Sequence, residues 1–141
     1  MATTSIRPRS SGKPKRVIRE DLDVSARLDE LRSLKDGWLE GKGLAPRAAG
    51  LDWFAAAVAR FYSADLPRPY LYPTPEGGLQ AEWTIGGQDI SLEVDLERKI
   101  GELHVLDLKS GATLAEELNM AHSSGWNRLA ELIGGFNGKT A

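Results

Sequence analysis

The sequence contains no cysteine and only two histidines among its 141 residues. It therefore has no disulfide, no thiolate nucleophile and no cysteine-bound zinc, and the histidines do not form the helical pair typical of a metal site. No stretch approaches the run of about 18 apolar residues that a membrane helix needs. The basic N-terminal residues are not followed by the apolar core of a secretory signal. These absences predict a cytoplasmic protein with no membrane segment, no metal and no cofactor.

Charge is distributed unevenly along the chain. The net charge is −2, but residues 1–19 contain six Lys or Arg and no acid, which leaves 12 basic and 20 acidic residues in 20–141, a net of −8. Residues 1–19 also have few apolar side chains, so they bury too little surface to offset the entropy of ordering. We therefore predict a flexible basic N-terminal arm over 1–19. Residues 20–141 have the length and apolar content of a single domain.

Apolar spacing predicts two helices in the first half of the chain. The first spans about 22–35, with Asp21 or Asp23 as its N-terminal cap, because a short carboxylate accepts hydrogen bonds from the free amides there. The second spans about 46–63 and is rich in alanine, which allows neighbours to approach closely. Its apolar residues recur at spacings of three and four: Leu51, Phe54, Val58 and Phe61.

A hairpin follows a short extended segment at 70–72. Gly86-Gly87 suits a two-residue turn, because glycine readily adopts the positive φ angles that such turns require. Pairing outward from this turn assigns the register, since a shift of one residue would exchange the two faces. The predicted core-face pairs are Ile85 with Gln88, Trp83 with Ile90, Ala81 with Leu92, and Leu79 with Val94. The pairs on the other face are Thr84 with Asp89, Glu82 with Ser91, and Gln80 with Glu93.

A further strand is predicted over 102–108. If its turn has Arg98-Lys99 as a two-residue loop, Leu103 lies opposite Val94, Val105 lies opposite Leu92, and His104 lies beside Glu93. Leu106 and Leu108 then fall on the polar face, which indicates either a bulge or a patch that another chain covers.

The segment 113–134 is predicted as a kinked helix or two short helices, because Thr113 and Glu116 have the spacing of a capping box. The complete prediction is an α+β fold: an antiparallel three- to four-stranded β-meander with helices packed on one face. One face of this meander is left open.

The residues of that open face are the candidate partner-binding site. A His104–Glu93 pair has the composition of a general base and its orienting group, but surface cross-strand pairs of this kind are far commoner, and no nucleophile accompanies it. Acids in these positions usually form the solvated face of a sheet, and a negative surface for a basic partner is the functional alternative. The candidate partner-binding residues are Gln80, Glu82, Asp89, Glu93, Asp95 and His104; no catalytic residue is proposed.

The basic arm gives a second candidate interaction. Lys and Arg side chains neutralise phosphates, which supports weak, salt-sensitive contact with nucleic acid. The acidic body lacks an aromatic-rich basic strand or a helix-turn-helix, so base-specific recognition is not expected. The candidate nucleic-acid-binding residues are Arg7, Arg9, Lys13, Lys15, Arg16 and Arg19.

Three sequence motifs together resemble a known pattern: Asp36-Gly37-Trp38 with glycines after it, Pro73-Thr74-Pro75-Glu76-Gly77-Gly78, and Glu82-Trp83. The chain is similar over about 28–96 to small, mostly uncharacterised bacterial, phage or plasmid proteins with a D-G-W…P-T-P-x-G-G…E-W pattern. The motif residues set turns and packing, and the resemblance brings no catalytic residues. Leu39-Glu40 after Trp38 departs from the usual loop. We expect Trp38 itself to fill a groove between the helices.

The resemblance implies an accessory protein of mobile elements, antitoxin-like or inhibiting a host defence. Combined with the acidic body and the scarcity of catalytic groups, it predicts a non-enzymatic protein-binding module of the small inhibitor, immunity or antitoxin type. The expected partner is another protein with a basic surface, and the chain itself is expected to be a monomer or homodimer. A nucleic-acid-associated accessory protein that uses the basic arm is the alternative.

Overall fold

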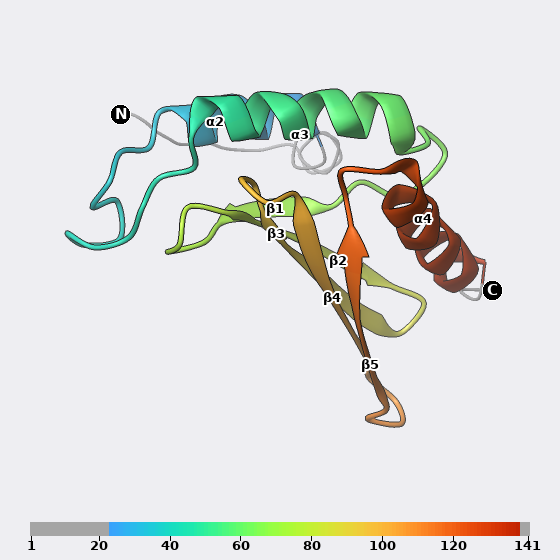
Figure 1. Cartoon of the computed structure of the whole chain (residues 1–141). Helices are drawn as coiled ribbons and strands as arrows, with labels where there is room; N and C mark the ends of the chain where they lie inside the picture. Colours follow the sequence, from blue (N-terminus) through green and yellow to red (C-terminus); the bar gives the residue numbers. More distant parts are fainter. Residues whose placement is uncertain (1–22, 139–141) are drawn as a thin grey trace, which may run out of the picture.

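Three helices and a five-stranded antiparallel sheet make up residues 23–138, the part of the chain that this computed structural model describes (Figure 1). The elements are α2 Val24–Arg32, α3 Ala48–Phe61, β1 Tyr70–Pro73, β2 Leu79–Ile85, β3 Gln88–Asp95, β4 Ile100–Asp107, β5 Thr113–Asn119 and α4 Ser123–Asn137. The strands lie in chain order, β1-β2-β3-β4-β5. The predicted α+β meander is confirmed, but it has five strands rather than three or four. The predicted arm over 1–19 lies outside the described residues.

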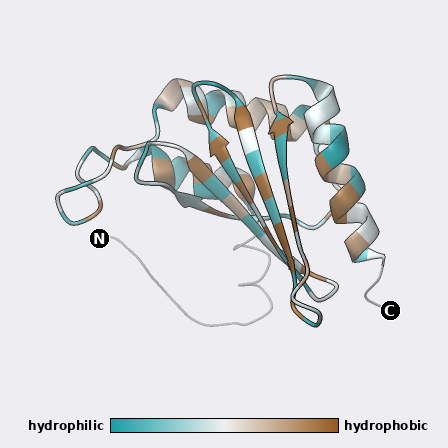
Figure 2. Cartoon of the chain, turned by 60° about the horizontal axis from the view of Figure 1, so that its bottom comes forward, coloured by the Kyte–Doolittle hydropathy of each residue, from teal (hydrophilic) through white to brown (hydrophobic). Residues whose placement is uncertain are grey.

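The hairpin of β2 and β3 has the predicted register in all seven pairs, from Ile85 opposite Gln88 to Leu79 opposite Val94. Gly86 and Gly87 adopt φ angles of 56° and 78°, the left-handed region that this turn requires. Along β2 and β3 buried and more exposed residues alternate, so that one face of each strand enters the core. Figure 2 shows the same alternation of hydrophobic and hydrophilic residues.

The predicted register of β4 is wrong by two residues. Asp95 pairs with Ile100, so the loop is the four residues 96–99; His104 therefore pairs with Ser91 rather than Glu93. The Asp95 side chain explains the longer turn, because its Oδ1 accepts from the amides of both Glu97 and Arg98 at 3.0 Å. The same register places Leu103 opposite Leu92 and Val105 opposite Ile90.

The prediction that 113–134 is helical is wrong for its first part, because residues 113–119 form the strand β5. The carboxylate of Asp107 accepts from the amides of Lys109 and Ser110 at 2.9 and 3.0 Å, and Gly111 adopts a φ of 81°. These features close a hairpin that pairs β5 with β4. A helix does follow, but α4 begins only at Ser123.

The helices cover one face of the sheet and enclose the core. The buried residues of α3 recur at spacings of three, as the predicted amphipathic helix requires. Trp126 of α4 lies at the centre, with its ring centroid 6.0 Å from that of Phe54 and 6.3 Å from that of Phe61. Its indole N–H donates to the Met120 carbonyl at 2.8 Å, so its one polar group is satisfied in the core. Figure 1 shows α2 and α3 along one side of the sheet and α4 beside β5.

Hydrogen bonds between its own residues stabilise the loop that contains Asp36-Gly37-Trp38. The Asp36 carboxylate accepts from the Ala45 amide at 2.9 Å, and this bond, with Arg47 beside it, holds the Asp36 pKa below its usual value. Trp38 donates its indole N–H to the Leu44 carbonyl within the same loop. The expectation that Trp38 fills a groove between helices is therefore wrong, because the ring does not join the core.

The second motif meets this loop: the Leu44 amide donates to the Pro75 carbonyl at 2.8 Å. Thr74 is buried, and its hydroxyl accepts from the Gly78 amide at 2.9 Å. Both motifs thus set loop conformation in this chain.

Within residues 23–138, no helix is both long enough and apolar enough to cross a membrane.

Candidate protein-binding surface

Alternate side chains of the five strands point away from the helices and form what we call the open face of the sheet. Tyr70 and Tyr72 of β1 occupy one end of this face, each with 43% of its surface exposed. At the far end the hairpin of β4 and β5 projects away from the helices (Figure 1). The strand registers place all six predicted partner-binding residues at open-face positions: Gln80, Glu82, Asp89, Glu93, Asp95 and His104.

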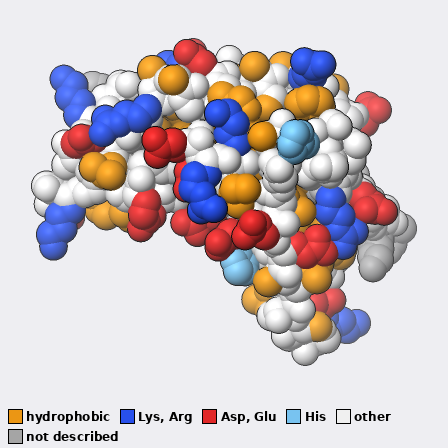
Figure 3. All heavy atoms as spheres, in the orientation of Figure 1, with side chains coloured by type: hydrophobic (Ala, Val, Ile, Leu, Met, Phe, Trp, Pro, Cys, Tyr) orange, Lys and Arg blue, Asp and Glu red, His pale blue; other side chains and the backbone are white. Residues whose placement is uncertain are grey.

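The strands are strongly biased toward negative charge. Together the five strands contain eight Asp or Glu residues and no Lys or Arg. In Figure 3 acidic side chains gather over the middle of the sheet, between the helices and the projecting hairpin. Because the cations of the described chain lie on helices and loops, the charge of the sheet is not balanced within it.

Three glutamates form the central feature of the open face. Glu93 pairs directly with Glu102, and Glu102 pairs directly with Glu117 on the next strand. We call these three residues the glutamate row. Carboxylates directly opposite one another on neighbouring strands repel and destabilise the sheet. None of the three is in an ion pair with any residue from 23 to 138.

A second line of side chains runs beside the glutamate row and contains His104. Its direct neighbours are Ser91 on β3 and Ala115 on β5, so the corrected register does not pair the imidazole with Glu93. No hydrogen bond joins His104 to a carboxylate among the residues described. The general-base pair considered from the sequence is therefore not assembled.

The remaining predicted residues have partners of their own. Asp95 caps the turn after β3, as described above. Asp89 accepts from the Thr84 hydroxyl at 3.1 Å. The side-chain amide of Gln80 donates to Glu82. Glu93 is thus the one acid of the predicted set that belongs to the glutamate row.

The site predicted from the sequence omits two glutamates and two tyrosines of the open face: Glu102, Glu117, Tyr70 and Tyr72. The predicted partner-binding set does not include Glu102, and the helical prediction for 113–134 places Glu117 outside the sheet. The exposed Tyr70 and Tyr72 had not been placed on either face. The Asp107–Gly111 segment, which has the composition of a hairpin turn, was the signal that could have revealed β5 and with it Glu117.

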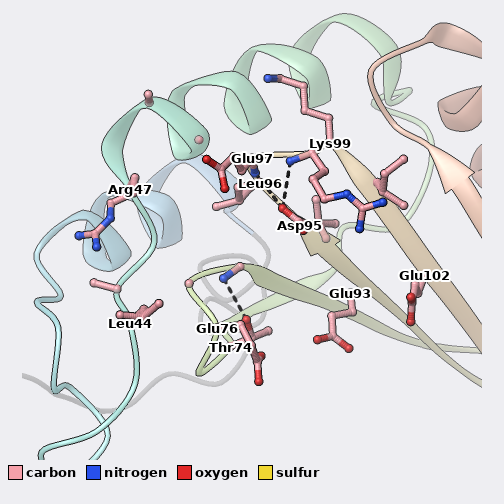
Figure 4. A pocket seen from close by; sticks show the side chains of 18 residues that line it. Leu44, Arg47, Thr74, Glu76, Glu93, Asp95, Leu96, Glu97, Lys99 and Glu102 are labelled. Carbon is pink, nitrogen blue, oxygen red and sulfur yellow. Dashed lines mark hydrogen bonds between the residues drawn. The ribbon is translucent and has the colours of Figure 1, made fainter.

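A hollow of about 760 Å³ adjoins one end of the glutamate row. It lies between the start of α3, the loop at 74–78 and the turn from β3 to β4, and it has both signs of charge. Figure 4 shows Glu93 and Glu102 on the side away from α3, and Arg47 at the start of that helix. The open face therefore continues into a mixed-charge recess.

The shifted pKa values belong to groups that hold the fold together. The amides of the β4–β5 turn and the Gln88 side chain lower the pKa of Asp107 to about 2. The Arg128 guanidinium lowers the pKa of Glu116, which it contacts from α4 at 2.6 and 3.0 Å. Burial raises the pKa of Tyr62 to about 12. None of these groups lies on the open face.

No cluster of His, Asp or Glu within 23–138 has the arrangement needed to hold a metal ion. The chain was also compared with protein-family models, with curated proteins and with solved structures, and no match was found in any of the three comparisons. The resemblance to small proteins of mobile elements therefore stays a prediction.

Proposed function

We propose that this protein is a non-enzymatic protein-binding module that uses its open sheet face to bind a partner with a basic surface. We place it in the class of small inhibitor, immunity or antitoxin proteins of mobile elements, acting in the cytoplasm as a monomer or homodimer. It would act by covering a basic, nucleic-acid-binding surface of its target. The observation that carries the proposal is the glutamate row, in which three carboxylates lie directly opposite one another and none is in an ion pair with a residue of 23–138.

Energetic reasoning supports this use of the row. Each like-charge cross-strand contact opposes folding by a few tenths of a kcal/mol up to about 1 kcal/mol. A basic partner would relieve that repulsion, and opposite potentials would also accelerate association. Tyr70 and Tyr72 lie on the same face, and exposed tyrosines are common anchors of binding energy at protein interfaces. The face thus combines electrostatic attraction with aromatic contact area.

The test is capture from a lysate of the source cells, at low and moderate salt, on the immobilised full chain and two variants. The row variant is E93Q/E102Q/E117Q, and the matched control is E30Q/E40Q/E131Q, which removes the same charge away from the open face. We expect a basic protein to be retained by the unaltered chain and the control but lost by the row variant. Equal retention by all three, or no specific protein at either salt, would contradict the proposal.

The alternative function, contact with nucleic acid through the basic arm, is favoured only by the +6 charge of residues 1–19. A variant in which those six cations are replaced by glutamine tests it. Salt-sensitive retention on DNA or RNA should disappear in this variant, while circular dichroism stays unchanged. Retention equal to that of the unaltered chain would exclude the arm as the contact.

A further inference from the structure

The hydrogen bonds between β4 and β5 determine which main-chain groups of β5 point outward. Met120 donates to the Lys99 carbonyl and Asp107 donates to the Ala112 carbonyl, both at 2.9 Å. In an antiparallel pair, bonded and non-bonded positions alternate, so the even-numbered residues of β5 bond to β4. The odd-numbered ones direct their N–H and C=O groups away from the sheet. These outward residues are Thr113, Ala115 and Glu117.

All three outward residues are exposed, and no other part of 23–138 bonds to their main-chain groups. The edge is closed only beyond them, where α4 begins: the His122 amide donates to the Asn119 carbonyl, and Gly125 packs against the Asn119 main chain. We call the stretch 113–117 the free β5 edge.

The opposite edge of the sheet is closed. Thr74 donates to the Gly78 carbonyl at 3.1 Å, so by the same alternation Leu71 and Pro73 face outward from β1. Proline has no N–H to offer, and the Leu71 carbonyl accepts from Arg27 of α2 at 2.8 Å. Short length, proline and a covering side chain are the usual means of protecting an edge strand. Among residues 23–138, β5 has neither a proline nor a side chain that bonds to its outward main-chain groups.

Charge indicates what would occupy the free β5 edge. Glu117 has outward main-chain groups and also ends the glutamate row on the open face. A strand added to this edge would place one of its side chains directly opposite Glu117, on the same face. β5 contains no Lys or Arg, so a second copy added through the same strand cannot provide a cation there. On the other side of the edge, the partly exposed Leu114 offers an apolar contact.

We propose that the free β5 edge binds an extended segment of the partner protein as a sixth strand, with a Lys or Arg opposite Glu117. This inference rests on the proposed function and specifies how the partner is held: main-chain hydrogen bonds at Ala115 and Glu117 give affinity, and alternating basic and apolar side chains give selectivity.

The experiment measures residue-specific amide exchange by NMR on the full chain, with and without a capped peptide of alternating lysine and valine. We expect the amides of Ala115 and Glu117 to exchange at least about tenfold more slowly in saturating peptide, because they gain acceptors. The amides of Leu114 and Glu116 already bond to β4 and should change far less.

Two controls separate strand addition from simple charge attraction. A peptide with the same sequence, N-methylated on the amides that would face β5, keeps its charge but loses its donors, and it should not protect the edge. Ala115→Pro places at this edge the device that Pro73 provides at the other, and it removes only an outward N–H. It should abolish protection by the lysine peptide, and Glu117→Gln should weaken peptide binding.

Several outcomes would overturn the inference. Equal binding of both peptides, still dependent on Glu117, would leave the proposed function intact and exclude strand addition. Protection of Ala115 and Glu117 without peptide would show that the edge is already taken, by a second copy if it varies with concentration and by the chain's own N-terminal segment if it does not. Failure of the lysine peptide to bind would also reject the inference. The proposed function would still be tested separately, by capture of a partner from lysate on the unaltered chain and on the E93Q/E102Q/E117Q variant.

Discussion

The two edges of the sheet differ in almost every feature that controls pairing. β1 has four residues, an outward proline and a main-chain carbonyl covered by Arg27. β5 has seven residues, and three of them have outward main-chain groups that form no hydrogen bond with any residue of 23–138. Unprotected edge strands promote unwanted association, and this sheet protects β1 by proline and a covering side chain. The same protection is missing at β5, which leaves that edge able to pair with another strand.

The free β5 edge also carries negative charge on the open face. Glu117 completes the glutamate row at this edge, whereas the β1 end of the open face consists of two tyrosines. A negative charge on an edge strand by itself deters pairing with another copy of the same strand. It does not deter a basic strand, and the difference between the edges therefore concerns selectivity as well as exposure.

The largest expected effect comes from Gly125→Ala, which disturbs the point where α4 closes the end of the β5 edge. A Cβ at this position would lie 2.2 Å from the Asn119 carbonyl oxygen, so helix and strand must separate. We expect a loss of about 3 kcal/mol in the free energy of unfolding, measured by urea denaturation. Gly135→Ala in the same helix has open space around it and should instead stabilise by about 0.5–1 kcal/mol. Equal effects of the two changes would contradict this packing.

Asp107→Ala should lower stability next most strongly, because two hydrogen bonds hold the β4–β5 turn through this side chain and a third joins it to the Gln88 side chain of β3. The folded pKa of about 2 is below the unfolded value of about 4. The carboxylate therefore contributes stability above pH 4 that is lost as the pH falls from about 4 to about 2. Thermal unfolding of the two proteins should converge across this window. A constant difference down to pH 2 would exclude the role given to Asp107.

Arg27→Met opens the protected edge while keeping an apolar stem. Loss of the bond to the Leu71 carbonyl should destabilise by about 1 kcal/mol in urea denaturation. Glu30→Gln is the control: it removes the exposed ion pair with Arg27 but leaves that bond, and it should change stability by only a few tenths of a kcal/mol. If Glu30→Gln had the larger effect, the ion pair and not edge protection would explain the role of Arg27.

The sequence predicted the part of the sheet whose register had only one consistent solution. Gly86-Gly87 set the turn, and a shift by one residue would have moved Trp83 and Leu92 out of the core. The turn after β3 admitted two lengths, and only the contacts of Asp95 decide between them. Turn length is thus the main limit on predicting β4.

β5 was missed because its pattern fits both structures. Leu114 and Leu118 are four apart, which places them on one face of a helix and equally on one face of a strand. The capping-box spacing of Thr113 and Glu116 then favoured the helix. In the structure, Glu116 of β5 forms an ion pair with Arg128 of α4. Glu93 could be predicted as part of the site because its hairpin was correct, whereas Glu117 could not.

The most direct test of the account is the stability of Glu102→Gln, because Glu102 lies between the other two glutamates of the row. Removal of its charge should raise the free energy of unfolding by about 0.5 kcal/mol. The gain should vanish in high salt, where exposed charges are screened. Glu40→Gln, on a loop, should give no gain at either salt. A decrease in stability for Glu102→Gln at low salt would contradict the claim that the row is unbalanced in the free protein.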